Sequence, residues 1–160
     1  MRAVVQRAAR AQVRVGDAVV GEIGRGLLIL LGVAESDTSD VATRLAAKVA
    51  ALRIFPYQMK PRRVSGPAQM NRSVVDVGGR VLVVSQFTLV ADLSRGNRPS
   101  FSTAATPERA KALYDAFIAA LRARVARVEC GEFGADMQVE LVNDGPVTFV
   151  LDAGAIATGV

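Results

Sequence analysis

Alternating and continuous apolar runs in the first third of the chain predict β-strands. Residues 12–15 alternate polar and apolar side chains (Gln-Val-Arg-Val), which is the period of a strand with one buried face. Gly16-Asp17 then predicts a hairpin turn into a second strand at residues 18–23. Residues 27–33 (Leu-Leu-Ile-Leu-Leu-Gly-Val) show no alternation, so we expect both faces of that strand to be buried.

Two later segments have the apolar spacing of a helix. Apolar residues recur every three or four positions through residues 41–52, behind several Ser, Asp and Thr capping candidates, and predict a helix near 38–53. The second helix opens at Thr106-Pro107-Glu108, which combines a cap, a proline at the first position and an acid in the first turn. Its buried stripe runs from Leu113 to Leu121.

The remaining apolar runs complete a set of strands. We expect strands at residues 74–77, 81–90, 125–130, 137–142 and 147–151, with Gly78-Gly79 between the first two. This order predicts a single α+β domain over residues 1–152, with a mostly antiparallel, barrel-like β-sheet and two main helices. Residues 153–160 are small and weakly patterned, and we expect a mobile tail there.

Composition narrows the possible chemistry. The 160 residues carry a net charge of +5, which favours an anionic partner such as nucleic acid, although a basic surface alone would also account for it. There is no histidine and one cysteine, Cys130, which excludes Ser-His-Asp and Cys-His catalysis and an internal disulfide. The first residues lack a signal-peptide layout and no apolar run could span a bilayer, so we expect a cytoplasmic protein without membrane contact.

Polar residues follow directly on a buried-type strand at Ser85-Gln86-Phe87-Thr88. If the strand continues, Gln86 and Thr88 share one face, and their amide and hydroxyl could orient a carbonyl, donate to an oxyanion or hold a water. The alternative is a strand that leaves the core with hydrogen-bonded polar residues at its rim, and the pattern alone favours this alternative.

A second polar segment, residues 143–148, separates two alternating runs. Asn-Asp-Gly at that place is a hairpin signal, and a hairpin is the favoured interpretation. Pro146 directly after Gly145 is at odds with it, because the returning strand would begin without an amide donor. A Gly-Pro bond can also be cis, and the sequence leaves cis and trans open.

Together these two segments resemble the motif pair of the D-aminoacyl-tRNA deacylase family. The resemblance continues in unbroken order over roughly residues 1–152. Further segments that carry it are Met1–Arg7, Gly21–Gly24, Leu31–Ala34, Leu52–Phe55, Val77–Gly79, Arg98–Phe101 and Phe133–Val139. Only the long basic loop at Pro56–Gln69 departs from the usual family pattern, and the tail after Asp152 is longer than expected.

This resemblance implies a homodimer with active sites at the subunit interface, acting without a cofactor or metal in chiral proofreading. The reaction would hydrolyse the ester between a D-amino acid and the terminal adenosine of tRNA. The catalytic motif would be Ser85, Gln86, Phe87 and Thr88, and Phe133, Ala135 and Met137 would line the adenosine pocket. Gly145-Pro146 would be a Gly-cis-Pro element, held by Arg7 and inserted into the partner's site to exclude L-amino acids.

Our leading mechanism is attack by water on the reactive ester, assisted by the adenosine 2′-hydroxyl, with Thr88 positioning rather than attacking. A covalent Thr88 nucleophile is the rival, and it would need an activating base that the motifs do not offer. Selection by steric exclusion would distinguish D side chains poorly and would admit glycine, so glycyl-tRNA is a further expected substrate.

The basic loops supply candidates for tRNA phosphate contact, with solvated surface charge as the alternative. These candidates are Arg95, Arg98, Lys60, Arg62 and Arg63. Two other classes of function remain open: a non-catalytic RNA-binding module on the same fold, and a small-molecule hydrolase.

Overall fold

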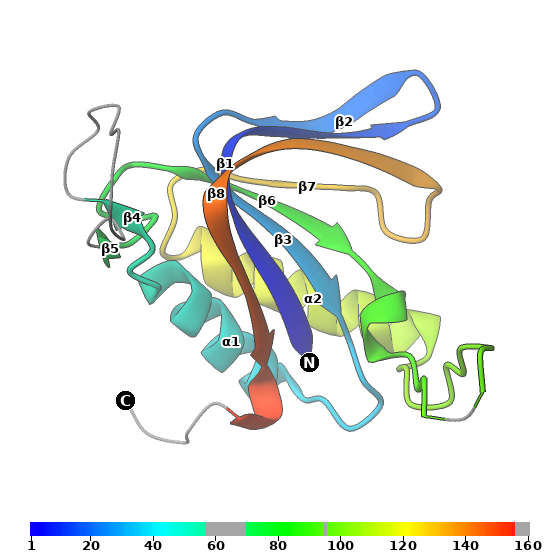
Figure 1. Cartoon of the computed structure of the whole chain (residues 1–160). Coiled ribbons are helices and arrows are strands. Elements are labelled where there is room, and N and C mark those ends of the chain that lie inside the picture. The colour runs from blue at the N-terminus through cyan, green and yellow to red at the C-terminus, as the bar shows by residue number, and fades with distance from the viewer. Residues whose placement is uncertain (57–69, 95, 156–160) are drawn as a thin grey trace.

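The computed structural model describes residues 1–56, 70–94 and 96–155 as a twisted sheet with two α-helices packed against one face (Figure 1). Within these residues no helix is long and apolar enough to cross a membrane. The elements, in chain order, are β1 (Arg2–Val15), β2 (Ala18–Ile23), β3 (Gly26–Gly32), α1 (Ser39–Ala51), β4 (Phe55–Pro56), β5 (Met70–Arg72), β6 (Arg80–Ser85), the 3₁₀ turn η1 (Phe87–Val90), α2 (Pro107–Arg122), β7 (Val128–Cys130), β8 (Met137–Asp152) and the 3₁₀ turn η2 (Ala153–Ala155).

Strand β1 organises the sheet because it is long enough to pair with three others. One of its edges pairs with β8 along almost its whole length, and the other pairs first with β3 and then with β2, all antiparallel. The sheet continues from β3 to β6 and β7 through parallel pairings. The predicted α+β fold with two main helices and a barrel-like sheet is confirmed; the sheet is mixed, with antiparallel pairing of β1 to β2, β3 and β8 and parallel pairing of β6 to β3 and β7.

The sheet is nearly closed and has a core on each side. Buried residues of β1, β3 and β6 pack against α1 and α2 on one face. On the other face Leu28, Leu82 and Val84 pack inside the curl of the sheet, where β2 approaches β7. A Cβ at Gly21 would lie only 2.9 Å from the Cys130 carbonyl oxygen, so glycine permits this approach. The predicted burial of both faces of residues 27–33 is confirmed.

Both predicted helices are present, whereas one predicted strand is not. Thr38 caps α1 by accepting a hydrogen bond from the Val41 N–H at 3.4 Å. Residues 74–77 form turns instead of a strand, because the Asp76 carboxylate accepts hydrogen bonds from the backbone and hydroxyl of Ser73 and closes the segment locally. The strand expected at 125–130 is shorter, as β7.

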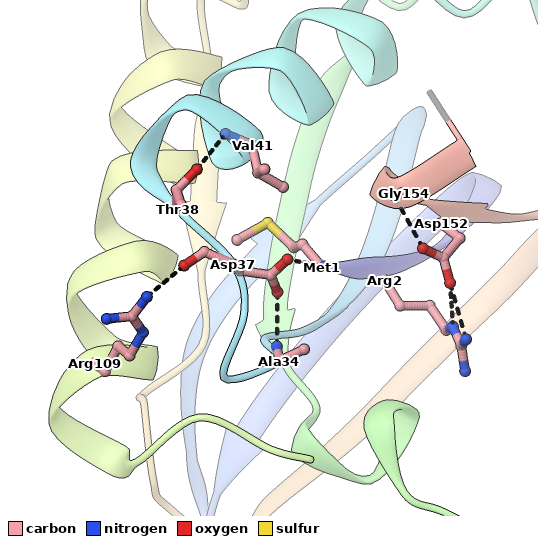
Figure 2. Close-up of polar contacts among 9 residues, drawn as sticks. All are labelled: Met1, Arg2, Ala34, Asp37, Thr38, Val41, Arg109, Asp152 and Gly154. Carbon is pink, nitrogen blue, oxygen red and sulfur yellow. Dashed lines mark hydrogen bonds and ion pairs between the residues drawn. The ribbon is translucent and has the colours of Figure 1, made fainter. Parts of the chain in front are cut away.

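The start of β1 is fixed by a buried ion pair between the Met1 ammonium and the Asp37 carboxylate (Figure 2). The other carboxylate oxygen of Asp37 accepts from the Ala34 N–H at 2.7 Å, and its backbone carbonyl accepts from Arg109 of α2 at 2.7 Å. The ion pair and these hydrogen bonds offset the desolvation penalty of the buried charges. One residue thereby joins β1, the β3–α1 connection and α2.

Gly26 is required where β3 meets β6, and this gives a testable consequence. A Cβ at Gly26 would lie 1.8 Å from the Arg80 carbonyl oxygen, so Gly26→Ala should force the strands apart and cost about 3 kcal/mol or more. Gly24→Ala is the matched control, since nothing lies within 4 Å of its Cβ position, and should change stability by less than about 0.5 kcal/mol. Urea unfolding measures both, and equal stabilities would contradict the close approach.

Candidate active site

Strand β6 ends at Ser85, so the prediction of a continuous strand to residue 90 is wrong. The Gln86 N–H still donates to the Leu31 carbonyl at 2.8 Å, but the chain then turns into η1. This turn packs over Gly32, where a Cβ would lie 2.9 Å from the Leu89 Cβ and 3.0 Å from the Gln86 carbonyl oxygen. The end of β6 therefore depends on a glycine in the neighbouring strand.

Gln86 and Thr88 lie together, although through the 3₁₀ turn and not through a shared strand face. The Gln86 side-chain amide donates to the Thr88 hydroxyl oxygen at 2.6 Å. Phe87 between them is 59% exposed, and its ring lies 4.8 Å from that of Phe101, centroid to centroid. An amide with two N–H donors keeps one free for another acceptor after this contact.

A cavity of about 640 Å³ opens beside this turn, between β6, η1, α2 and the segment before β8. Of the described residues, its lining includes Ser85, Gln86 and Phe87 but not Thr88. The same cavity is lined by Phe133, Ala135 and Met137, so the structure brings two of the predicted residue groups to one place. Its other lining residues are Leu31, Val33, Val84, Phe101, Ala104, Ala105, Pro107, Ala110, Tyr114, Gly134, Asp136 and Val139.

None of these other lining residues was predicted as a site residue, and two of them, Phe101 and Tyr114, are aromatic. The Tyr114 hydroxyl donates to the Val83 carbonyl at 2.9 Å, and its ring lies 5.6 Å from that of Phe133. Burial raises the pKa of Tyr114 far above its usual value, so this phenol stays neutral. Phe101 ends a segment that already resembled the family, whereas a buried helical tyrosine gives no separate signal in the sequence.

The cavity is nearly uncharged and largely apolar. Among the described residues that line it, Asp136 alone carries a charge, and polar groups are concentrated at Ser85 and Gln86. Such a site can bind a flat aromatic group between apolar walls and can donate hydrogen bonds to a carbonyl at its rim. It is suited to orienting an ester, and Asp136 is the one carboxylate in its described lining.

The predicted hairpin at residues 143–145 is wrong, because Met137–Asp152 is a single strand, β8, paired with β1 on both sides of this segment. Asn143 pairs with Ala8 and Thr148 with Gln6, so residues 144–147 bulge out opposite Arg7. Proline has no N–H for the ladder, and a bulge accommodates it. The Gly145-Pro146 bond is cis, and both residues are exposed.

Arg7 lies buried beneath this bulge, with 7% of its surface exposed. Its Nε donates to the Asp144 carbonyl at 2.9 Å and lies 3.0 Å from the Asp144 carboxylate, and a terminal nitrogen donates to the Ile54 carbonyl. The Asn143 amide closes the other side by donating to the Arg7 carbonyl at 2.9 Å and the Val147 carbonyl at 3.2 Å. The bulge is therefore a fixed element and not a loose loop.

Within one chain this bulge and the cavity are apart. Arg7 pairs with Leu27, which pairs in turn with Val81, whereas Ser85 is four residues further along β6. That offset is about 13 Å along the strand direction and about 10 Å across two strands. Among the described residues, the cavity lining does not include Gly145 or Pro146.

Of the predicted phosphate contacts, only Arg98 can be placed. It is exposed in the loop between Asp92 and Ser100, whose backbones form a bridge, and it is not among the described lining residues of the cavity. Lys60, Arg62, Arg63 and Arg95 lie outside the described residues, as does the end of the predicted tail, residues 156–160.

Comparison with known proteins identifies the family. The model of the D-Tyr-tRNA(Tyr) deacylase family matches residues 4–152. A D-aminoacyl-tRNA deacylase of Anaeromyxobacter dehalogenans is 59% identical over 96% of this chain and 97% of its own, and that of Deinococcus radiodurans is 58% identical over 95% and 99%. The chain belongs to this family. The predicted family is thus confirmed, and with it the class of enzyme, a hydrolase that acts on the ester of a D-aminoacyl-tRNA.

Two solved structures have the same fold. One, titled "c-Myc DNA Unwinding Element Binding Protein", has a TM-score of 0.84 and 38% identity, covering 95% of this chain and 98% of its own. The other, a probable eukaryotic D-amino acid tRNA deacylase, has a TM-score of 0.78 at 18% identity, covering 94% and 97%, and shows the fold alone.

The contacts of Arg7 predict an asymmetry between two substitutions. Arg7→Met should cost about 2–4 kcal/mol, because it leaves the Ile54 and Asp144 carbonyls without their donor. Asp144→Asn keeps the carbonyl contact and should cost no more than about 1 kcal/mol, because the Asp144 side chain is 44% exposed. Urea unfolding compares them, and equal losses would show that the ion pair rather than the backbone contact holds the bulge.

Proposed function

We propose that this chain hydrolyses the ester between a D-amino acid and the 3′-terminal adenosine of tRNA, as chiral proofreading during translation in the cytoplasm. The observation that carries the proposal is the cavity in which Ser85–Phe87 and Phe133–Met137 converge. Its aromatic and apolar walls suit an adenine ring, and its polar rim suits the ester attached to the adjacent ribose.

The proposed chemistry is attack by water on the ester carbonyl, assisted by the 2′-hydroxyl of the adenosine. The remaining Gln86 N–H and backbone N–H groups near Phe87 would donate to the developing oxyanion, an arrangement worth about 10²–10³ in rate per donor. An aminoacyl ester is already reactive, so this acceleration suffices without histidine. Tyr114 is kept neutral and is bound to the Val83 carbonyl, so it takes no proton from the water.

Thr88 has a positioning role in this proposal. Its hydroxyl accepts from the Gln86 amide and would hold that amide in place. Among the described residues that line the cavity there is no amine or imidazole, and the one carboxylate, Asp136, has no described contact with Thr88.

Thr88→Ala therefore separates the two mechanisms. It should lower the rate of D-aminoacyl-tRNA deacylation by less than about 10-fold, since only the orientation of Gln86 is relaxed. Single-turnover release of a labelled D-amino acid measures this rate. A loss greater than about 10³-fold would instead support a covalent Thr88 intermediate.

Selection of the D-form is assigned to Gly145-Pro146 of a second subunit. The bulge is exposed, it is held by Arg7, and it is remote from the cavity of its own chain. In a homodimer with the sites at the interface, it would fill the space that an L side chain needs. Glycine has no side chain to exclude, so glycyl-tRNA would also be accepted. A protein that sediments as a monomer at working concentration would remove the basis for this arrangement.

Gly145→Ala tests both the activity and its stereochemistry. The wild-type protein should release D- but not L-amino acids from tRNA. An added Cβ would lie 2.3 Å from the Asn143 Oδ1, so the Asn143 side chain, which holds the bulge through the Arg7 and Val147 carbonyls, or the bulge itself must shift, and the ratio of D to L rates should fall at least about 10-fold. Gly154→Ala is the matched control, since its Cβ would lie 3.4 Å from the Asp152 Oδ1 in ordinary contact. Unchanged discrimination in Gly145→Ala would refute steric selection.

A second candidate is nucleic-acid binding without catalysis. The net charge of +5 favours it, and so does the 38% identical structure whose title describes a protein that binds a DNA unwinding element. Tight binding of aminoacyl-tRNA without any release of amino acid would support this second candidate over the first.

A further inference from the structure

Five arginines gather at the end of the sheet opposite the cavity. They lie where β3, β6 and β7 begin and where β4 pairs with β5, on the left in Figure 1, whereas η1 and the start of α2 lie on the right. We call them the arginine cluster: Arg25, Arg53, Arg72, Arg80 and Arg127.

Backbone contacts hold Arg25, Arg80 and Arg127 side by side at the starts of β3, β6 and β7. The Arg80 N–H donates to the Arg25 carbonyl at 3.1 Å, and the Val81 N–H donates to the Arg127 carbonyl at 3.0 Å. The guanidinium of Arg25 lies 5.3 Å from the centre of the Phe55 ring, and Phe55 pairs with Arg72 in the small second sheet.

The other two arginines of the cluster, Arg53 and Arg72, lie near the carboxylate of Asp76. Hydrogen bonds from Ser73, and then the charges of Arg72 and Arg53, hold the pKa of Asp76 below its usual value. Arg72 also donates to the Asp76 carbonyl. Asp76 lies between Arg72 and Arg80 in the chain, and Glu129 follows Arg127. Five positive charges against these two negative ones leave a net charge of +3 for the arginine cluster and these acids.

The cavity end has the opposite character. Asp136 is the charged residue among its described lining residues, which gives a polyanion no attraction there. An enzyme whose substrate is an RNA needs cations beside its site, because phosphate contacts supply most of the affinity. The arginine cluster lies at the other end of the sheet, while Arg98 is exposed in the loop before Phe101 and Arg2 is paired with Asp152 beside η1.

The arginine cluster lies at the same end of the sheet as the Gly145-Pro146 bulge. Arg7, which holds Gly145-Pro146, lies 5.9 Å from the centre of the same Phe55 ring that Arg25 contacts. Whatever brings Gly145-Pro146 to a partner's cavity also brings the arginine cluster close to that cavity. We infer that the arginine cluster of one subunit binds the phosphates of the tRNA acceptor end whose terminal adenosine occupies the cavity of the other subunit. This inference rests on the proposed function and on its cross-subunit arrangement.

Arg53→Gln/Arg127→Gln tests the cluster, since both side chains are exposed. The matched control, Arg44→Gln/Lys111→Gln, removes the same charge from two surface ion pairs on the helices. The cluster variant should raise KM for D-aminoacyl-tRNA about 10-fold with kcat unchanged, and lower the slope of log(kcat/KM) against log[salt] by roughly 1.5. The control should change neither, and equal effects in both variants would overturn the inference.

Mixed dimers test the cross-subunit part. One subunit carries Gln86→Ala, so that only the other cavity is active. Removing Arg53 and Arg127 from the inactive subunit should raise KM, whereas removing them from the active subunit should not. The reverse result would place the contact within one chain and overturn the inference.

Binding of uncharged tRNA gives a readout that does not depend on hydrolysis. Weaker, less salt-dependent binding of the cluster variant than of the control supports the inference even if no ester is released, whereas equal binding overturns it. Absence of D-amino acid release by the wild type would instead refute the proposed function. The two failures are therefore distinguishable.

Discussion

The buried guanidinium of Arg7 is the contact on which the rest of the arrangement depends. It bonds to Ile54 between α1 and β4 and to Asp144 in β8, and it lies against the ring of Phe55 and next to the central strand pairings. A buried charge without partners would be too costly, so the backbone around it must supply acceptors. Those acceptors come from segments far apart in the chain, and satisfying one cation therefore fixes the geometry of an exposed cis-Pro bulge.

A second constraint, the close approach of backbones at glycine, shapes the cavity. Gly32 lets η1 fold back over β3, which ends β6 at Ser85 and turns Gln86 and Phe87 toward the cavity. Gly26 lets β3 and β6 pair in parallel, so Ser85 reaches the edge beside α2. The polar motif therefore lies at a cavity rim because of two small residues that themselves take no part in chemistry.

The sequence predicted local features well and non-local ones poorly. Both helices and the doubly buried strand at residues 27–33 follow from periodicity, which is a local property. The prediction of a hairpin at 143–145 was wrong because β1 is 14 residues long and pairs with β8 on both sides of this segment. That pairing overrides the local turn signal of Asn-Asp-Gly. The prediction of a strand to residue 90 was wrong because the end of β6 depends on Gly32 in the neighbouring strand, over which the chain turns into η1. Phe133, Ala135 and Met137 were assigned to the pocket through resemblance alone, and Tyr114 gave no separate signal.

In the proposed function, three tasks that many enzymes combine at one place belong to separate parts of the chain. The cavity is nearly uncharged, which suits an adenine ring and a neutral ester but gives no affinity for phosphate. The bulge is rigid, which suits discrimination by shape, since a loose element would yield to an L side chain at little cost. The arginine cluster lies beside the bulge, since Arg25 of the cluster and Arg7 contact the same Phe55 ring. A charge placed in the cavity would have to be desolvated with every substrate, so separating charge from chemistry removes that penalty. In the proposed dimer, the bulge and the arginine cluster of one subunit would lie beside the cavity of the other.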